Sequence, residues 1–269
     1  MRSITAEQKI YYTLRVATAM CFIGHGMFGI ITKPIWCNYF AVFGITENLA
    51  YQLMPPLGFL DIVMGLVILF RPVRALFFWL AIWGAVTAFL RPLSGEPFAE
   101  FVERAGNYGA PFALLVLTGI AVPNFRHLLR PVGPEVSHDP KKLKQVQWVL
   151  RIVVFMLVAG HGWLNLLEKE AILNQYAFLG FSNPAMTAKT IGILELLAAV
   201  CVLVRPVAPF ILVLFLWKML SESFYLHYGT FEWIERGGSY GAILALWFAT
   251  SSKFTVFKFN GRGKQISTA

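Results

Sequence analysis

The sequence predicts an all-α, polytopic membrane protein with eight transmembrane helices, arranged as two parallel repeats of four. Three observations support this fold class. Hydrophobic residues make up 57% of the 269 residues and charged residues 14%, whereas a soluble domain carries about a quarter charged residues. The apolar residues fall into runs of about 16 to 20, long enough to cross a bilayer core of about 30 Å as helices. Finally, the second half of the chain repeats the motifs of the first.

The boundaries of the eight spans follow from these runs and from the prolines between them. Arg-Pro pairs separate several runs, and proline ends or starts a helix because it lacks a backbone N–H. The last run is short, and we expect it to extend toward Phe254–Phe257. The expected spans are 13–31, 52–70, 74–90, 108–123, 149–167, 186–204, 207–225 and 239–251.

A long polar segment, Arg126 to Lys144, divides the chain. We therefore expect a first four-helix repeat at 1–125, a cytoplasmic linker at 126–148, a second repeat at 149–252 and a cytoplasmic tail at 253–269. The polar start leads into a full-length span without a small-residue cleavage site, so we expect no removable signal peptide.

The internal repeat extends over most of both halves. Because four spans per copy is an even number, both copies enter the membrane from the same side and are parallel, not inverted. The matched motifs are Gly24-His25-Gly26 with Gly160-His161-Gly162, Gly58-Phe-Leu-Asp61 with Gly192-Ile-Leu-Glu195, Trp83 with Trp217, and Glu103-Arg-Ala-Gly-Asn-Tyr-Gly109 with Glu235-Arg-Gly-Gly-Ser-Tyr-Gly241.

The distribution of charge predicts the orientation. Most of the 23 lysines and arginines lie on the side that holds both termini, and the positive-inside rule places that side in the cytoplasm. The basic residues are scattered over several loops, which argues against a nucleic-acid partner. On the outer side, 96–104 and 230–236 alternate aromatic and acidic residues at helical spacing. We expect each to form a short helix at the interface.

Four ionisable residues fall inside the expected spans. His25 lies in the first span and His161 in the fifth, while Asp61 lies in the second and Glu195 in the sixth. Ionisable groups at this depth are costly, so they are candidates for a functional site. Small residues share the helix face of each acid and would let another helix approach closely. We therefore expect the acids to face protein and not lipid.

The two copies differ in the seventh span. Lys218 and Glu222 are four residues apart and are expected to form an ion pair on one helix face. Their counterparts in the first copy are Gly84 and Ala88. Either Glu222 simply neutralises Lys218, or the two copies have specialised so that one pocket exists instead of two.

Three interpretations of these residues remain open. Each histidine could hydrogen-bond the acid of its own repeat and hold two helices together. His25 and His161 could meet across the pseudo-axis as ligands of a haem or metal. The third interpretation is a pocket for a quinone or similar small molecule that exchanges protons with histidine and carboxylate, walled by two tryptophans. The candidate ligand-binding residues are His25, Asp61, Trp83, His161, Glu195, Trp217, Lys218 and Glu222.

The residues Arg15, Gly24-His25-Gly26 and Lys33, followed by an acid in the second span and an Arg-Pro pair before the third, resemble the DoxX-like superfamily. This group includes the DoxD subunit of thiosulfate:quinone oxidoreductase. The resemblance covers nearly the whole chain, once per repeat, as a tandem duplication. It implies a bacterial-type inner-membrane protein associated with redox or sulfur metabolism. The duplication and the Lys218–Glu222 pair depart from the simple pattern.

The function we expect is that of an integral subunit of a redox complex, with a quinone-type pocket in the outer half of the bundle and a partner subunit or a second copy of itself. The chain has no Rossmann glycine motif, P-loop or CxxCH haem-attachment motif. Electrons would therefore come from a partner or from a non-covalently held cofactor, and catalysis by the chain itself stays open. The alternatives are a small-solute carrier, whose halves rock about a central polar site, and a non-catalytic scaffold.

Overall fold

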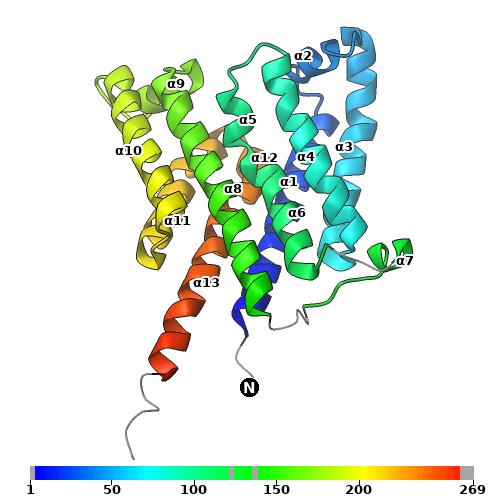
Figure 1. The fold of residues 1–269 in the computed structure, drawn as a ribbon. Helices are drawn as coiled ribbons and strands as arrows, with labels where there is room; N and C mark the ends of the chain where they lie inside the picture. The colour runs from blue at the N-terminus through cyan, green and yellow to red at the C-terminus, as the bar shows by residue number, and fades with distance from the viewer. Residues whose placement is uncertain (1–3, 121–123, 135–138, 261–269) are drawn as a thin grey trace, which may run out of the picture.

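The computed structural model describes residues 4–120, 124–134 and 139–260, and these form helices and connecting loops with no strand among them (Figure 1). The first half contains α1 (Ala6–Ile30), α2 (Trp36–Ala41), α3 (Glu47–Phe70), α4 (Arg74–Leu93), α5 (Ala99–Glu103) and α6 (Ala105–Thr118). The short α7 (Phe125–Leu128) leads toward the second half. The second half contains α8 (Pro140–Leu166), α9 (Glu170–Phe178), α10 (Pro184–Val204), α11 (Ala208–Glu222), the 3-10 helix η1 (Ser223–Tyr228), α12 (Thr230–Glu235) and α13 (Gly237–Asn260).

Six helical segments of the described chain are long and apolar enough to cross a membrane, where the sequence predicts eight. They are α1, α3, α4, α8, α10 and the segment Ala208–Tyr228. The expected span 108–123 corresponds to α6, whose 14 residues rise only about 21 Å at 1.5 Å per residue. Residues 121–123 of that span lie outside the described residues. The expected span 239–251 falls within α13, which continues to Asn260.

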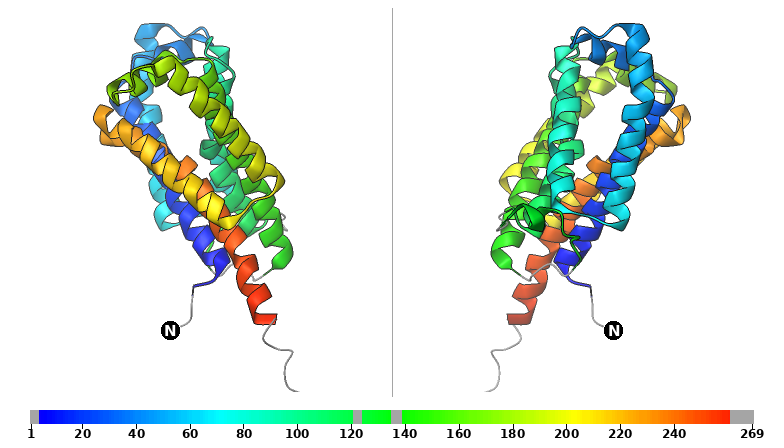
Figure 2. Two further views of the ribbon diagram at one scale, coloured as in Figure 1. Left: turned by 90° about the vertical axis from the view of Figure 1, so that its left-hand side faces the viewer. Right: turned by 90° about the vertical axis from the view of Figure 1, so that its right-hand side faces the viewer.

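Four central helices, α1, α6, α8 and α13, form the core, and a pair of helices flanks it on each side. In the core, α1 packs along α13 and α6 along α8. Outside it, α3 lies on α1 and α4 on α6, while α10 lies on α8 and α11 on α13. The two views of Figure 2 face these flanking pairs, α10 and α11 on the left and α3 and α4 on the right. The outward surfaces of the pairs are apolar, as Phe59 (62% exposed) and Leu194 (56% exposed) illustrate, which is typical of helices that contact lipid.

Local sequence signals set the ends of the long helices. Thr5 and Gln8 form a capping box at the start of α1, which satisfies two of the otherwise unpaired backbone N–H groups. At the other end of the flanking helices, arginines from the core pair with unpaired carbonyls. Arg15 Nε donates to the carbonyl of Ile68 at 3.0 Å in the last turn of α3. Arg151 Nη2 donates to the carbonyl of Val204 at 3.1 Å, at the end of α10.

Several expected boundaries differ from the structure. The first and fifth spans begin earlier than predicted, at Ala6 and Pro140, because polar first turns precede their apolar runs. The linker expected at 126–148 is correspondingly shorter, and residues 135–138 within it are not described. The sequence does not predict the two short helices α2 and α9, whereas α5 and α12 confirm the short helices expected at 96–104 and 230–236. The start of α1 and the end of α13 lie at the same end of the bundle, opposite α2 and α9 (Figure 1).

Candidate functional site

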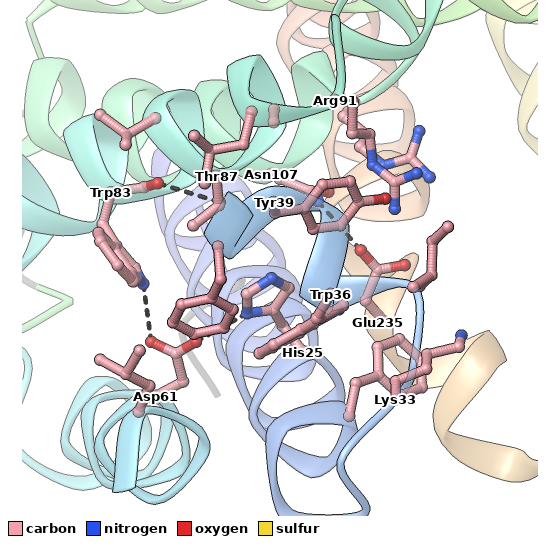
Figure 3. A pocket seen from close by; sticks show the side chains of 18 of the residues that line it. His25, Lys33, Trp36, Tyr39, Asp61, Trp83, Thr87, Arg91, Asn107 and Glu235 are labelled. Carbon is pink, nitrogen blue, oxygen red and sulfur yellow. Dashed lines mark hydrogen bonds and ion pairs between the residues drawn. The ribbon is translucent and has the colours of Figure 1, made fainter. Parts of the chain in front are cut away.

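A pocket of ≈ 800 Å³ lies in the first half, between α1, α2, α3 and α4, and reaches α12 of the second half. Most of its wall is apolar, supplied by aliphatic and aromatic side chains of α2, α3 and α4. The polar groups that line it come from α1, α3, α4, α6 and α12 and from the loops beside α2 and α5 (Figure 3). These polar and charged residues are His25, Lys33, Asp61, Thr87, Arg91, Arg104, Asn107, Glu232, Glu235 and Arg236.

A hydrogen-bonded chain of three side chains marks one end of the pocket. His25 Nδ1 lies 2.7 Å from Asp61 Oδ2, and Trp83 Nε1 donates to the other carboxyl oxygen at 2.9 Å. Asp61 is 2% exposed. An ionised carboxylate can only accept hydrogen bonds, so Nδ1 carries the proton of the first bond. The second ring nitrogen of His25 is turned away from Asp61 toward the pocket (Figure 3) and is free to contact a ligand.

The short helix α2 covers this pocket at the end of the bundle. The ring of Trp36 lies 4.6 Å from the ring of His25. Tyr39 donates its hydroxyl proton to Glu96 Oε1 at 2.6 Å, and the Arg91 guanidinium lies 5.3 Å from the Tyr39 ring. Aromatic packing and a partly buried hydrogen bond therefore hold α2 against α1 and against the end of α4.

Charged side chains from both halves form the other end of the pocket. Asn107 Nδ2 donates to Glu235 Oε1 at 3.1 Å, across 128 residues of sequence. Burial raises the pKa of the Glu235 carboxyl, but the positive charges of Arg236 and Arg104 outweigh this effect, and the pKa is lowered overall. Glu235 therefore stays ionised, as expected for a buried acid with cationic neighbours.

The corresponding cluster in the second half is more completely hydrogen-bonded. His161 Nδ1 lies 2.7 Å from Glu195 Oε2, and Trp217 Nε1 donates to Glu195 Oε1 at 3.3 Å. Asn165 Nδ2 donates a further bond to Glu195 Oε2 at 3.2 Å. The hydroxyl of Tyr176 donates to Asn165 Oδ1 at 2.8 Å. Glu195 thus accepts from three side chains where Asp61 accepts from two.

The ion pair expected in the second half is present and belongs to a larger network. Lys218 pairs with Glu222, and the two residues are 3% and 2% exposed. Glu222 Oε2 lies 2.7 Å from Arg236 Nε, and Lys218 Nζ lies 4.0 Å from Glu103 Oε1 of the first half. Burial raises the pKa of the Glu103 carboxyl, but Arg104 and Lys218 outweigh this effect and lower the pKa overall. The network therefore joins the two halves through ionised groups.

The structure places the eight predicted site residues in two groups. His25, Asp61 and Trp83 line the pocket, and the other five residues are not part of its lining. Each histidine bonds the acid of its own repeat, as the helix-bonding interpretation expects. Within the described residues there is no group of three or more metal-ligating side chains. The second group is His161, Glu195, Trp217, Lys218 and Glu222.

Several residues of the pocket have no strong signal in the sequence. Trp36 and Tyr39 lie on an unpredicted helix, and Arg91 stands out only as part of an Arg-Pro pair. Arg104 and Glu235 belong to the repeated motif Glu-Arg-x-Gly-x-Tyr-Gly. A charged motif that contains glycine and recurs in both halves indicates a closely packed contact. This pattern could have identified Arg104 and Glu235 from the sequence.

Comparison with protein-family profiles, curated proteins and solved structures finds no match to this chain. The resemblance to the DoxX-like superfamily therefore stays a prediction from the sequence.

Proposed function

We propose that the protein is an integral subunit of a membrane redox complex and that its first half binds a quinone-type ligand in the pocket beside His25 and Asp61. The observation that carries this proposal is a ≈ 800 Å³ pocket with mostly apolar walls and a His25–Asp61–Trp83 chain at one end. Binding sites for small ligands are commonly about 300–1,000 Å³, apolar, and furnished with a few placed polar groups. A flat aromatic head with two carbonyl groups suits such a site.

The histidine and the acid supply the acid–base chemistry that such a ligand needs. A quinone becomes a hydroquinone by taking up two electrons and two protons. In the proposal, a partner subunit provides the two electrons and the His25–Asp61 pair delivers one proton. The second proton comes from solvent at the charged end of the pocket, where the Lys33 side chain is 32% exposed. Protonated His25 donates from Nε2 to a ligand carbonyl, and neutral His25 accepts from a ligand hydroxyl. Asp61 stabilises the imidazolium while the proton is held.

The finer architecture that we propose is eight spans in two parallel four-helix repeats. Support comes from contacts between the halves that occur in pairs. A residue of the first half contacts the second half, and its counterpart in the second half makes the equivalent contact with the first half. A Cβ added at Gly24 would lie 2.5 Å from the backbone nitrogen of Glu235, and one at Gly160 would lie even closer to that of Glu103. Lys33 pairs with Glu232 of the second half, and Lys169 pairs in the same way with Glu100 of the first half. Such paired contacts are expected of two similar units related by a pseudo-twofold axis.

We propose a bacterial-type inner-membrane location with both termini in the cytoplasm. The basic residues of the sequence favour this orientation, and the start of α1 and the end of α13 lie together at one end of the bundle (Figure 1). The pocket then lies toward the outer leaflet. The electron-donating partner would be a separate subunit.

Extraction of bound lipids from the purified protein tests the proposal. Chromatography of the extract should detect a quinone in the wild-type protein, and His25→Ala and Asp61→Asn should reduce it to background. His161→Ala is the matched control and should retain the quinone, because His161 lies outside the pocket. A Soret band in the absorbance spectrum would instead indicate haem. Folded variants and no quinone in any sample would favour a carrier, and unfolding of both histidine variants would favour a purely structural role.

A further inference from the structure

The helices α3 and α4 face each other across the pocket with matching apolar stripes. On α3 the lining residues include Leu53, Leu57 and Leu60, and on α4 they include Val86 and Leu90. The spacings within each stripe are three, four or seven residues, so each stripe follows one helix face. In most helix pairs such stripes pack against each other and exclude space.

These two stripes are held apart. In the described chain, α3 packs along α1 and α4 packs along α6, but α3 and α4 are not packed along each other. The hydrogen bond from Trp83 to Asp61 joins the two helices at one level of the bundle. Phe77 and Leu80, on the side of that bond away from α2, are fully buried in the core. The space between the helices therefore begins at the Asp61–Trp83 bond and extends toward α2.

Two of the apolar residues that line this space are strongly exposed. Leu60 lines the pocket and is 49% exposed, and Val86 lines it and is 42% exposed. Because α3 and α4 are not packed along each other, these exposed side chains mark an opening between the two helices. Trp36 and Tyr39 of α2 are buried, but Ile35 and Phe43, which flank α2 and also line the pocket, are 43% and 64% exposed. The exposed lining is therefore apolar from the gap between α3 and α4 up to α2. The apolar opening therefore faces sideways, where lipid surrounds a membrane protein.

We infer that the ligand enters the pocket sideways from the bilayer, between α3 and α4, and that it carries an apolar tail that stays in this opening while its polar head reaches His25 and Asp61. This inference rests on the proposed function and specifies its substrate class: a membrane-resident molecule with a long tail, in contrast to a small water-soluble quinone. The apolar residues at the opening, Leu60 and Val86, favour a hydrocarbon chain over a polar ligand.

Binding in lipid nanodiscs tests this route with two probes that share a head group. One is 2,3-dimethoxy-5-methyl-1,4-benzoquinone, which has no tail, and the other carries a decyl chain. After correction for partition into the lipid, the decyl compound should bind at least roughly tenfold more tightly, equivalent to about 1.4 kcal/mol. The double variant Leu60→Trp/Val86→Trp should remove this advantage, so that the decyl and tailless probes bind it with similar affinity. The matched control is Leu194→Trp/Leu220→Trp, at the equivalent positions of the second half, and it should bind both probes as the wild type does.

The outcomes separate this inference from the proposed function. Equal affinity of the wild type for both probes overturns the sideways route and leaves the quinone pocket standing. The sideways route is also overturned if the double variant at Leu60 and Val86 binds both probes as its control does. If neither probe binds the wild type, the quinone proposal fails, and the route is then decided by chemical labelling without a quinone.

Labelling uses Thr87→Cys, a pocket-lining position, in a protein whose native Cys21, Cys37 and Cys201 are replaced by alanine. A lipid-soluble pyrene maleimide should label this cysteine at least roughly tenfold faster than a charged, membrane-impermeant maleimide, because only the former reaches the opening through the bilayer. Ser221→Cys is the second-half counterpart, next to the Lys218–Glu222 pair, and should be labelled slowly by both reagents. Equal labelling of Thr87→Cys by both reagents, or by neither, would contradict the inference.

Discussion

The two halves of the molecule share a helical scaffold and differ in what it encloses. In the first half, Gly84 of α4 packs against α6, Ala88 lines the pocket one turn later, and a pocket is present. In the second half, Lys218 and Glu222 stand at the equivalent positions of α11 and form a buried ion pair. The contacts that hold the helices together recur in both halves, whereas the contents of the two interiors do not. The difference supports the proposal that one interior binds a ligand, on a helical scaffold that both halves share.

Glycine at position 84 has a second effect in the first half. A Cβ added there would lie 2.9 Å from the backbone oxygen of Asn107, so α4 can approach α6 closely only without a side chain. Gly84 therefore allows α4 to pack closely on the core, and the small side chain that borders the pocket is Ala88. In the second half, Lys218 extends to Glu222 and toward Glu103 instead.

The largest expected effect comes from breaking the buried pair. Lys218→Ala should lower the free energy of unfolding by about 3–5 kcal/mol, because Glu222 loses one partner inside the protein. Replacing both residues, as Lys218→Met/Glu222→Met, should cost much less, since buried pairs are often replaceable by apolar side chains of similar volume. Denaturant unfolding in detergent measures both. If the double variant is less stable than Lys218→Ala, the Lys218–Glu222 pair contributes more to stability than apolar side chains of similar volume can replace.

A smaller loss of stability is expected from substituting Gly24 or Gly160, and the loss should be the same at both positions. Gly24→Ala and Gly160→Ala each place a Cβ against the backbone of the opposite half and should destabilise by about 1–3 kcal/mol through overpacking. Val16→Ala, at a 48% exposed position of α1, is the control and should change little. Thermal unfolding compares the three. Markedly unequal effects at the two glycines would contradict the proposed pseudo-symmetry.

A large side chain placed inside the first half should affect ligand binding differently from one placed at the equivalent position of the second half. Thr87→Trp inserts a large side chain into the pocket and should weaken binding of the decyl quinone at least roughly tenfold, or about 1.4 kcal/mol. Ser221→Trp, at the equivalent position of the second half, should leave binding unchanged. Equilibrium dialysis is the suitable assay, because its readout does not depend on the fluorescence of the added tryptophan. Similar losses in both variants would show that the ligand contacts both interiors.

The smallest expected effect is a change in acid sensitivity. Burial raises the pKa of Glu100, but Arg104, Arg91 and Lys169 outweigh this effect and lower the pKa below its ordinary value of 4.5. The unfolded state therefore binds this proton first as the pH falls, so the stabilisation is complete above pH 4.5 and is lost as the pH falls through the lower folded-state value. Glu100→Gln should flatten the fall in melting temperature below that pH. Glu232→Gln, at the more exposed counterpart, is the comparison and should alter the slope less.

Much of the scaffold was predictable because it depends on local patterns. The long apolar runs and the Arg-Pro pairs identify helices such as α3 and α10, and helical spacing pairs Lys218 with Glu222. The histidine–acid pairs were one of three interpretations that the repeat left open, and the structure contains both pairs. The short helices α2 and α9 were not predictable, because so few residues inside a loop carry too little periodicity.

The pocket itself could not be predicted in the same way. By sequence, Arg104 and Arg236 are the last residues of the expected outer helices, and the fold leaves their side chains only 16% exposed. The separation of α3 from α4 depends on the level at which Trp83 meets Asp61. Neither the arginine burial nor the helix separation has a local sequence pattern, because both arise from contacts between distant segments.

The interlocking of the halves has a consequence for biosynthesis. Lys33 pairs with Glu232, 199 residues later in the chain, and Gly24 lies against Glu235. The surroundings of α1 are therefore complete only after α12 has been made. Until then, the side of α1 that carries Gly24 faces lipid or the insertion machinery. Nascent chains that stop before α12 should therefore be preferred targets for membrane proteases.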